Sequence, residues 1–120
     1  MTEQRWAAEL PISITVCDSN GMILEMNEKS KATFAADGGG ALIGTNVLDC
    51  HPEPSRSQLA DMLVERTTNI YTIEKNGVKK LIYQMPWYEN AEYRGYVELS
   101  LEIPFDMPHF VRANSKPAQG

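Results

Sequence analysis

The sequence predicts an α+β domain in which a five-stranded antiparallel sheet carries short helices on one face, with the chain order ββαααβββ. Runs of alternating apolar and polar residues, the pattern of half-buried strands, occur twice before the middle of the chain and three times after it. Two Asn-Gly pairs, Asn20-Gly21 and Asn76-Gly77, each follow such a run and predict tight hairpins. The residues between the two groups of strands repeat with a helical period, so we expect the helices to cluster there.

The first hairpin is predicted from residues 12–17 and 22–26. Alternation places Ile14 and Val16 together on one face of the first strand, and it places Leu24 on the apolar face of the return strand. Because the apolar face of a half-buried strand normally packs on the core, we expect these three side chains to point inward.

Two helices are predicted after this hairpin. Asn27 is a residue type that accepts hydrogen bonds from the first free NH groups of a helix, so we expect it to cap a helix over residues 28–34 that turns Phe34 inward. A longer helix is expected over residues 55–66, with Ser57 or the serine two residues earlier as its cap. Its inward stripe, spaced at i, i+3 and i+4, consists of Leu59, Met62 and Leu63.

Three strands are predicted in the second half of the chain, over residues 69–75, 79–88 and 96–103. The last has the clearest alternation in the sequence, with Leu99 on its apolar face and Glu98 on its polar face. We therefore expect Ile73, Tyr83 and Leu99 to face the core and Glu98 to face solvent. Residues 89–95 are expected to form the turn between the last two strands.

Composition limits the classes of function. The 120 residues are enough for one domain with one core, and 42% of them are hydrophobic and 22% charged. A formal net charge of -5 argues against nucleic acid and anionic membrane surfaces as partners, because both bind basic patches. No apolar run approaches the ~20 residues of a membrane span, and the N-terminal region lacks the apolar segment of a signal peptide. We therefore expect a cytoplasmic protein with Cys17 and Cys50 reduced.

The predicted domain covers residues 11–104, between an N-terminal helical cap at residues 1–10 and a tail at residues 105–120. Both flanks contain large apolar side chains. We expect these side chains to contact a second copy of the chain in a homodimer; the alternatives are that the N-terminal ones cover the domain's own core and that the C-terminal ones pack against its sheet. They are Trp6, Leu10, Phe105 and Phe110.

Four short motifs occur in order along the predicted domain: LPISITV at residues 10–16, DSNGMILEMN at 18–27, LIG at 42–44 and YRGYVE at 93–98. The second fits the pattern D-x-x-G-x-I-x-x-x-N. In their order and spacing these motifs resemble a PAS domain over residues 10–103. The resemblance implies a five-stranded antiparallel sheet whose helices enclose a small cavity, and a role in sensing or dimerisation during signal transduction.

The run VLDCHP at residues 47–52 is similar to one PAS subgroup, which carries CHPP at this place and often accompanies hemerythrin-like domains. Glu53 stands where that subgroup has its second proline, so the match to the subgroup is imperfect. No kinase, cyclase or DNA-binding module follows the last strand in this sequence. We therefore expect a separate output protein that acts in trans.

The cavity that the resemblance implies would be bounded by residues whose periodicity points them inward, together with the connector before the longer helix. These residues could line a cavity for a small-molecule ligand or fill a packed core, because a cavity wall and a packed core have the same sequence signature. The predicted lining consists of Ile14, Val16, Leu24, Phe34, Leu48, Cys50, His51, Met62, Leu63, Ile73, Tyr83 and Leu99.

Haem and flavin are cofactors of some PAS domains. The resemblance implies an axial histidine within the longer helix for haem, but Gln58 or Leu59 falls at that position, and His51 precedes the helix. A photochemical flavin site would have an arginine and a glutamine near its cysteine, and the residues around Cys50 provide neither. The cofactor is therefore unassigned, and a haem or redox sensor that uses Cys50 and His51 is the alternative.

Metal binding and catalysis are the remaining alternatives. The soft metal ligands Cys17, Cys50, His51 and His109 are spread along the chain, and neighbouring residues such as Cys50 and His51 rarely chelate one ion. Asp49 and His51 could act as an acid-base pair, but no nucleophile motif accompanies them. We expect no metal site and no enzymatic activity, and we expect His51 to fix its connector by a hydrogen bond to the backbone.

Overall fold

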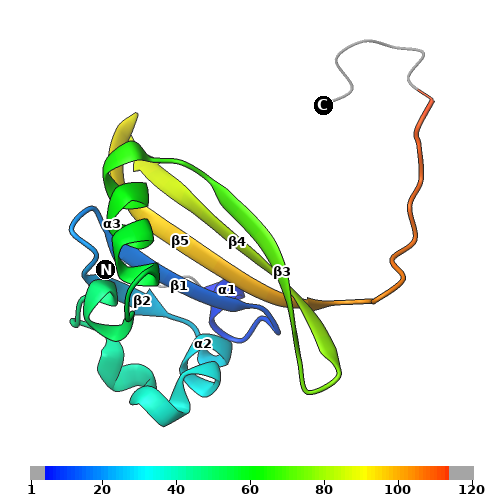
Figure 1. The fold of residues 1–120 in the computed structure, drawn as a ribbon, viewed down its shortest axis with the longest axis horizontal. Coiled ribbons are helices and arrows are strands. Elements are labelled where there is room, and N and C mark those ends of the chain that lie inside the picture. The colour runs from blue at the N-terminus through cyan, green and yellow to red at the C-terminus, as the bar shows by residue number, and fades with distance from the viewer. Residues whose placement is uncertain (1–4, 114–120) are drawn as a thin grey trace.

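The structure is a computed structural model that describes residues 5–113. Its sheet has five antiparallel strands in the order β2-β1-β5-β4-β3, which confirms the predicted α+β fold (Figure 1). The strands are β1 (Ser13–Asp18), β2 (Ile23–Met26), β3 (Asn69–Lys75), β4 (Val78–Glu89) and β5 (Glu92–Ile103). The α-helices are α1 (Arg5–Ala8), α2 (Glu28–Thr33) and α3 (Ser55–Glu65), and short 3-10 helices are η1 (Ala35–Asp37), η2 (Gly39–Leu42) and η3 (Val47–Cys50).

The two flanks of the domain are described in part. Part of the helix predicted over residues 1–10 is present as α1, and residues 1–4 lie outside the described residues. Residues 104–113 lead away from the end of β5 without regular structure (Figure 1), and the rest of the predicted tail, residues 114–120, also lies outside the described part. Between residues 5 and 113, no helix is both long enough and apolar enough to cross a membrane.

Both predicted hairpin turns are present, and they differ in local chemistry. In the first turn the carboxylate of Asp18 accepts hydrogen bonds from the backbone NH groups of Asn20 and Met22, both at 2.9 Å. In the second turn Asn76 and Gly77 have φ angles of 54° and 77°, as a type I′ turn requires. The strands on either side of each turn pair with one another, so both predicted hairpins are confirmed.

The turn between β4 and β5 is shorter than the predicted residues 89–95. It consists of Asn90 and Ala91, both at positive φ, and β5 begins directly after them. Gly95 therefore lies inside a strand that pairs with β1. A Cβ atom at this position would overlap the carbonyl oxygen of Cys17, so glycine is required by the close approach of two strands.

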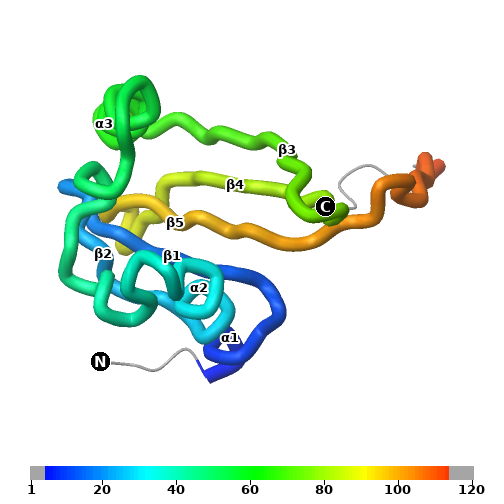
Figure 2. The backbone as a smooth tube through the Cα atoms, turned by 60° about the horizontal axis from the view of Figure 1, so that its bottom comes forward, coloured from blue at the N-terminus to red at the C-terminus, as the bar shows by residue number. Residues whose placement is uncertain are grey.

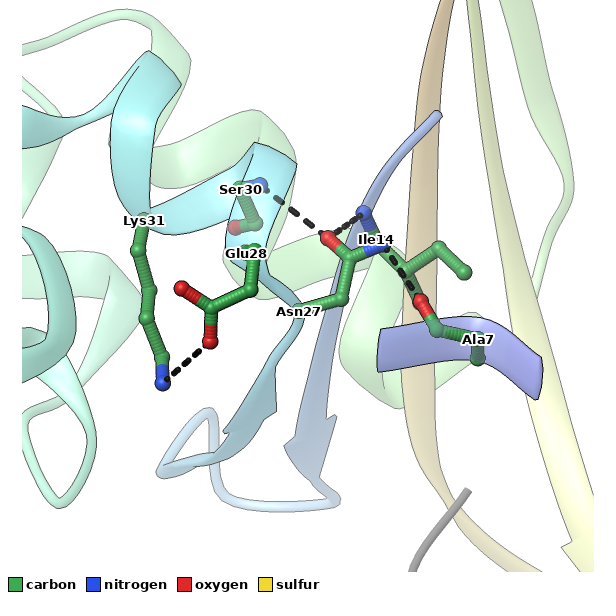
Figure 3. A network of polar contacts seen from close by, with 6 residues as sticks. All are labelled: Ala7, Ile14, Asn27, Glu28, Ser30 and Lys31. Carbon is green, nitrogen blue, oxygen red and sulfur yellow. Dashed lines mark hydrogen bonds and ion pairs between the residues drawn. The ribbon is translucent and has the colours of Figure 1, made fainter. Parts of the chain in front are cut away.

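Asn27 caps α2, as predicted. Its Oδ1 accepts a hydrogen bond of 3.0 Å from the backbone NH of Ser30 (Figure 3). At the start of α3 the predicted serine cap is wrong, because the carboxylate of Glu53 accepts from the backbone NH of Ser57 at 3.1 Å and from its hydroxyl at 2.9 Å. These hydrogen bonds lower the pKa of the Glu53 carboxyl. The residue that departs from the CHPP run thus stabilises the beginning of a helix.

Two tyrosines of β5 attach α3 to the sheet. The hydroxyl of Tyr93 donates a hydrogen bond to the carbonyl oxygen of Leu63 at 2.8 Å. The hydroxyl of Tyr96 lies 2.7 Å from the carbonyl oxygen of Met62 and 2.6 Å from that of Thr67. Leu63 and Tyr96 also pack in one buried cluster. The C-terminal half of α3 is therefore held by polar contacts to its backbone as well as by apolar packing.

In β1, β4 and β5 the helices cover the opposite face of the strand to the one predicted. Strand pairing aligns one row of side chains across β1, β5 and β4: Ile14, Leu99 and Tyr83. The adjacent residue of each strand forms a row on the opposite face: Thr15, Glu98 and Gln84. This second row borders the same cavity as residues of α2 and α3, so the helices cover the polar row. Figure 2 shows the two helices apart, with α2 beside β1 and β2 and α3 toward β3.

The predicted inward orientation is therefore wrong for five residues of the sheet, and the predicted outward orientation of Glu98 is wrong as well. The alternation itself is present, but the apolar row faces away from the helices. On this outward face the apolar side chains are half-buried, apart from the more exposed Leu24. The five residues are Ile14, Val16, Leu24, Tyr83 and Leu99.

Candidate ligand-binding cavity

A cavity of about 480 Å³ lies between the sheet and the helices, a size typical of sites for small organic molecules. Side chains from all five strands, from α2 and α3, and from the connecting segments border it. The sheet contributes Thr15, Cys17, Ile23, Met26, Tyr71, Ile73, Lys75, Lys80, Ile82, Gln84, Tyr96, Val97, Glu98 and Ser100. The helical side contributes Thr33, Phe34, Asp37, Leu42, Val47, Cys50, His51, Leu59 and Met62.

A chain of side-chain hydrogen bonds crosses three strands of the sheet. The amide of Asn69 in β3 donates to Oε1 of Gln84 in β4 at 3.0 Å. Nε2 of Gln84 donates in turn to Oε2 of Glu98 in β5 at 2.7 Å. The strand register places the three residues next to one another. Because Gln84 uses its acceptor toward one neighbour and its donor toward the other, the chain fixes the Glu98 carboxylate at the cavity wall.

The polar wall continues toward α2. Oγ1 of Thr15, which borders the cavity, lies 2.6 Å from Oγ of Ser30. Ser30 is completely buried, and its backbone NH is the group that Asn27 caps. The cavity wall in β1 is therefore joined by hydrogen bonds to the beginning of α2.

One side of the cavity, along the edge strand β3, is exposed to solvent. Every residue of β3 is exposed, and the cavity-lining Tyr71 and Ile73 keep 41% and 39% of their surface accessible. Burial of the side chain, and secondarily the negative charge of Glu98, raises the pKa of the Tyr71 hydroxyl. A solute can reach the polar wall from this side without displacing a helix.

The two cysteines differ in their surroundings. Cys17 is only 5% exposed and packs against Leu63 and Tyr96, whereas Cys50 is exposed, and both thiols are free. Burial raises the pKa of the Cys17 thiol, although the backbone hydrogen bond from Tyr96 acts in the opposite direction. Cys17 therefore behaves as a small apolar side chain at neutral pH, and Cys50 is the accessible thiol.

His51 is tied to the backbone of its own connector, as predicted. Its Nδ1 lies 2.6 Å from the carbonyl oxygen of Val47, so this nitrogen carries the proton that it donates. The carboxylate of Asp49 instead points to Arg56, at 4.0 Å. No hydrogen bond or ion pair within residues 5–113 joins Asp49 to His51, so the acid-base pair that the sequence allowed is not assembled.

The predicted lining residues fall into three groups. Five border the cavity: Phe34, Cys50, His51, Met62 and Ile73. Two others, Leu48 and Leu63, belong to the buried cluster that packs against Cys17 and Tyr96. The remaining five are on the outward sheet face. Four polar residues that alternate with these apolar ones border the cavity and were not predicted to do so, although their polar periodicity is visible in the same strands: Thr15, Gln84, Glu98 and Ser100.

The residues present do not fit an axially ligated haem at the position that the PAS resemblance implies. Gln58 is exposed there, and Leu59 borders the cavity without an atom that binds iron. Among residues 5–113 there is also no group of three or more histidine, cysteine, aspartate or glutamate side chains that could hold a metal ion.

No protein-family model matches the sequence, and no curated protein matches it in sequence. Solved structures match it in fold. The PAS domain of BvgS from Bordetella pertussis is 16% identical over 84% of this chain and 83% of its own, with a TM-score of 0.61. A sensory box sensor histidine kinase from Vibrio cholerae is 13% identical over 84% and 89%, with a TM-score of 0.58. The Aer2 receptor from Vibrio cholerae, described as a dual PAS-haem oxygen sensor, is 18% identical over 78% and 95%, with a TM-score of 0.54. The chain therefore has the fold of a PAS domain.

Proposed function

We propose that this chain is a sensory module of signal transduction that binds a small molecule in its cavity and catalyses no reaction. The observation that carries the proposal is the cavity of about 480 Å³ inside a PAS fold, which is lined mainly by apolar side chains and carries the hydrogen-bonded polar pair of Gln84 and Glu98 on its sheet wall. The similar structures support a signalling role, because two of them are described as an oxygen sensor and a sensor histidine kinase. The separation of Asp49 from His51 supports the non-catalytic part of the proposal.

We also propose that the outward sheet face pairs with a second copy of the chain. Leu81 and Leu101 are paired across β4 and β5, next to the row of Ile14, Leu99 and Tyr83. Half-buried apolar residues on adjacent strands form the kind of surface that a partner covers. The flanking side chains predicted for the interface would extend it: Trp6, which is 71% exposed, the half-buried Leu10, and the exposed Phe105 and Phe110. A cytoplasmic location, a separate output protein and the CHPP subgroup stay predictions.

A fragment screen by NMR tests ligand binding. The expected result is that some compounds shift backbone resonances of residues that border the cavity. Ile73→Trp fills the cavity mouth from β3, and we expect it to weaken such binding about tenfold or more. Val64→Trp is the control, because Val64 is 80% exposed on α3 and borders neither the cavity nor the outward sheet face. A diverse library in which no compound perturbs cavity residues of the wild-type protein would contradict the proposed function.

Sedimentation equilibrium tests the dimer. Leu99→Asp places a charge in the centre of the outward face, and we expect it to weaken dimerisation by at least about tenfold. Val64→Asp is the control, since Val64 is 80% exposed on α3, outside the proposed interface. Removal of residues 1–10 is also expected to weaken the dimer. A wild-type chain that stays monomeric, or a dimer unaffected by Leu99→Asp, would rule out this interface.

A haem or redox sensor is the second candidate function, because Cys50 and His51 both border the cavity and both are exposed. An absorption spectrum of the freshly purified protein distinguishes the two candidates. A Soret or flavin band that disappears in His51→Ala would favour the second candidate. A colourless protein that takes up no added haem excludes the haem form of it.

A further inference from the structure

The Glu98 carboxylate is the fixed charge of the sheet wall. One of its oxygens, Oε2, accepts the hydrogen bond from Gln84, and Gln84 is itself oriented by Asn69. This arrangement presents the rest of the carboxylate to the cavity that Glu98 borders. A carboxylate held in a partly enclosed space is most stable when a positive charge pairs with it.

No cation of the described residues supplies that positive charge. Within residues 5–113 the ion pairs join Lys31 to Glu28, Arg56 to Asp49 and Arg94 to Glu89, and none involves Glu98. Lys75 and Lys80 border the cavity, but Lys80 precedes Gln84, the partner of Glu98, by four residues of β4, and Lys75 pairs with Val78, still further along that strand. Four residues of extended strand span about 13 Å, so the Lys80 backbone lies near the β3–β4 turn and away from the carboxylate.

An aromatic ring accompanies the carboxylate. Tyr71 pairs with Ile82, two residues before Gln84 on the same cavity-facing side of β4, so its ring is a diagonal neighbour of the hydrogen-bond chain. Burial, followed by the charge of Glu98, raises the pKa of its hydroxyl, which agrees with this proximity. Aromatic faces and carboxylates both attract organic cations. Apolar side chains on the remaining cavity surface, among them Phe34 and Ile73, suit the hydrocarbon part of such a molecule.

We propose that the cavity selects a small molecule with a positively charged organic group, an ammonium or a guanidinium, attached to an apolar body. Glu98 pairs with the charge, Gln84 holds Glu98 in place, and the side of the cavity along β3 gives access. This inference rests on the proposed function, because it names the ligand class of the proposed sensory cavity. An anionic ligand placed at this wall would be repelled by Glu98, and a neutral ligand would leave the carboxylate unpaired.

Three probes that share a phenyl ring and differ in charge test the proposal by NMR titration of the full chain: benzylamine, benzyl alcohol and benzoate. We expect benzylamine to shift the backbone resonances of Tyr71, Gln84 and Glu98 and to bind at least about tenfold more tightly than benzyl alcohol. Benzoate is expected to bind more weakly than either. Because the interaction is between charges, the advantage of benzylamine should shrink in 0.5 M salt, since the screening length falls from about 10 Å at 0.1 M toward about 3 Å at 1 M.

Glu98→Gln keeps the size of the side chain and removes its charge. We expect this variant to lose the preference for benzylamine over benzyl alcohol, by about tenfold in the ratio of the two dissociation constants. Glu102→Gln is the matched control, because Glu102 is an exposed residue of the same strand that does not border the cavity. If the control reduces the preference as much as Glu98→Gln, the effect is one of net charge and the proposal is wrong.

The outcomes separate this proposal from the proposed function. Binding of benzyl alcohol or benzoate at the cavity as tight as that of benzylamine would overturn cation selectivity and leave a ligand-binding module. If none of the three probes and no compound of the broader fragment library perturbs cavity residues, both the cation selectivity and the proposed ligand-binding function are wrong. If the wild type prefers benzylamine and Glu98→Gln keeps that preference, another group causes the selectivity and the proposed role of Glu98 is wrong.

Discussion

The side-chain amide of Asn27 donates a hydrogen bond of 2.9 Å to the carbonyl oxygen of Ala7, and it thereby joins the N-terminal helix α1 to the beginning of α2 (Figure 3). The same nitrogen donates to the carbonyl oxygen of Ile12 at 2.8 Å. Oδ1 accepts from the backbone NH groups of Ile14 and Ser30, each at 3.0 Å. The amide thus uses both of its donors and both lone pairs of its acceptor, and backbone groups of α1, β1 and α2 depend on one side chain.

Replacement of Asn27 by alanine should therefore destabilise the domain strongly. The change leaves partly buried backbone groups without their partners, and we expect a loss of about 3 kcal/mol in the free energy of unfolding and on the order of 10 °C in Tm. Urea denaturation and calorimetry measure both quantities. Hydrogen exchange should also become faster in α1, because the contact to Ala7 is lost.

Glu28→Ala is the control for Asn27→Ala, because it removes a neighbouring side chain of the same helix. Glu28 forms only an exposed ion pair of 3.3 Å with Lys31 (Figure 3), and such pairs contribute less than about 1 kcal/mol. Equal stability of the two variants would show that the Asn27 network does not hold the three segments together.

Gly95 should not tolerate any side chain. A Cβ atom there would overlap the carbonyl oxygen of Cys17, and the residue has a φ of 151°. We expect Gly95→Ala to cost at least about 3 kcal/mol, through steric overlap and backbone strain, and to reduce the yield of folded protein. Thermal unfolding followed by circular dichroism measures the loss.

Gly77→Ala separates the overlap at Gly95 from the general cost of a left-handed conformation. Gly77 has a φ of 77°, but no atom lies within 4 Å of the Cβ that alanine would add. The expected cost is therefore only about 1–2 kcal/mol. A Gly95→Ala variant no less stable than Gly77→Ala would mean that β1 and β5 do not approach each other as closely as described.

Cys50 should react with thiol reagents much faster than Cys17. Cys17 is buried, and its pKa is raised mainly by that burial, so little thiolate is present at pH 8 and the sulfur is inaccessible. Titration of the native protein with a chromogenic disulfide should show one fast thiol, which Cys50→Ser removes and Cys17→Ser does not. Two fast thiols in the native wild-type protein would contradict the burial of Cys17.

Sequence patterns gave the strands, the hairpins and the cap of α2, because these features depend on neighbours along the chain. They did not give the orientation of the sheet. Alternation distinguishes two faces of a strand such as β5, but it does not say which face the helices cover, and here a wall with Glu98 and Gln84 is the covered one. The contact of Glu53 with Ser57 at the beginning of α3 is equally local, but it was missed because glutamate is not one of the residue types usual for a helix cap and because Pro54 separates it from the helix.

The raised pKa of Tyr93 predicts that the domain loses stability in alkaline solution. Its pKa is raised to about 12, first by burial and then by its neighbour Tyr96, against an ordinary value near 10. Since the folded state keeps this proton while the unfolded state loses it, stability is fully present below about pH 10 and falls as the pH rises toward 12. Ionisation would also remove the proton that Tyr93 donates to Leu63 and with it one attachment of α3.

Tyr93→Phe tests this dependence. We expect the variant to lose about 1 kcal/mol at pH 7, because the hydrogen bond to Leu63 is absent, and then to lose stability less steeply than the wild type between pH 10 and 12. Tm measured across this range gives the slope, and absorbance at 295 nm follows ionisation of the phenols. Tyr96 has a raised pKa as well, so some slope should remain in the variant. If Tm falls equally steeply with pH in the two proteins, ionisation of Tyr93 does not cause the loss of stability between pH 10 and 12.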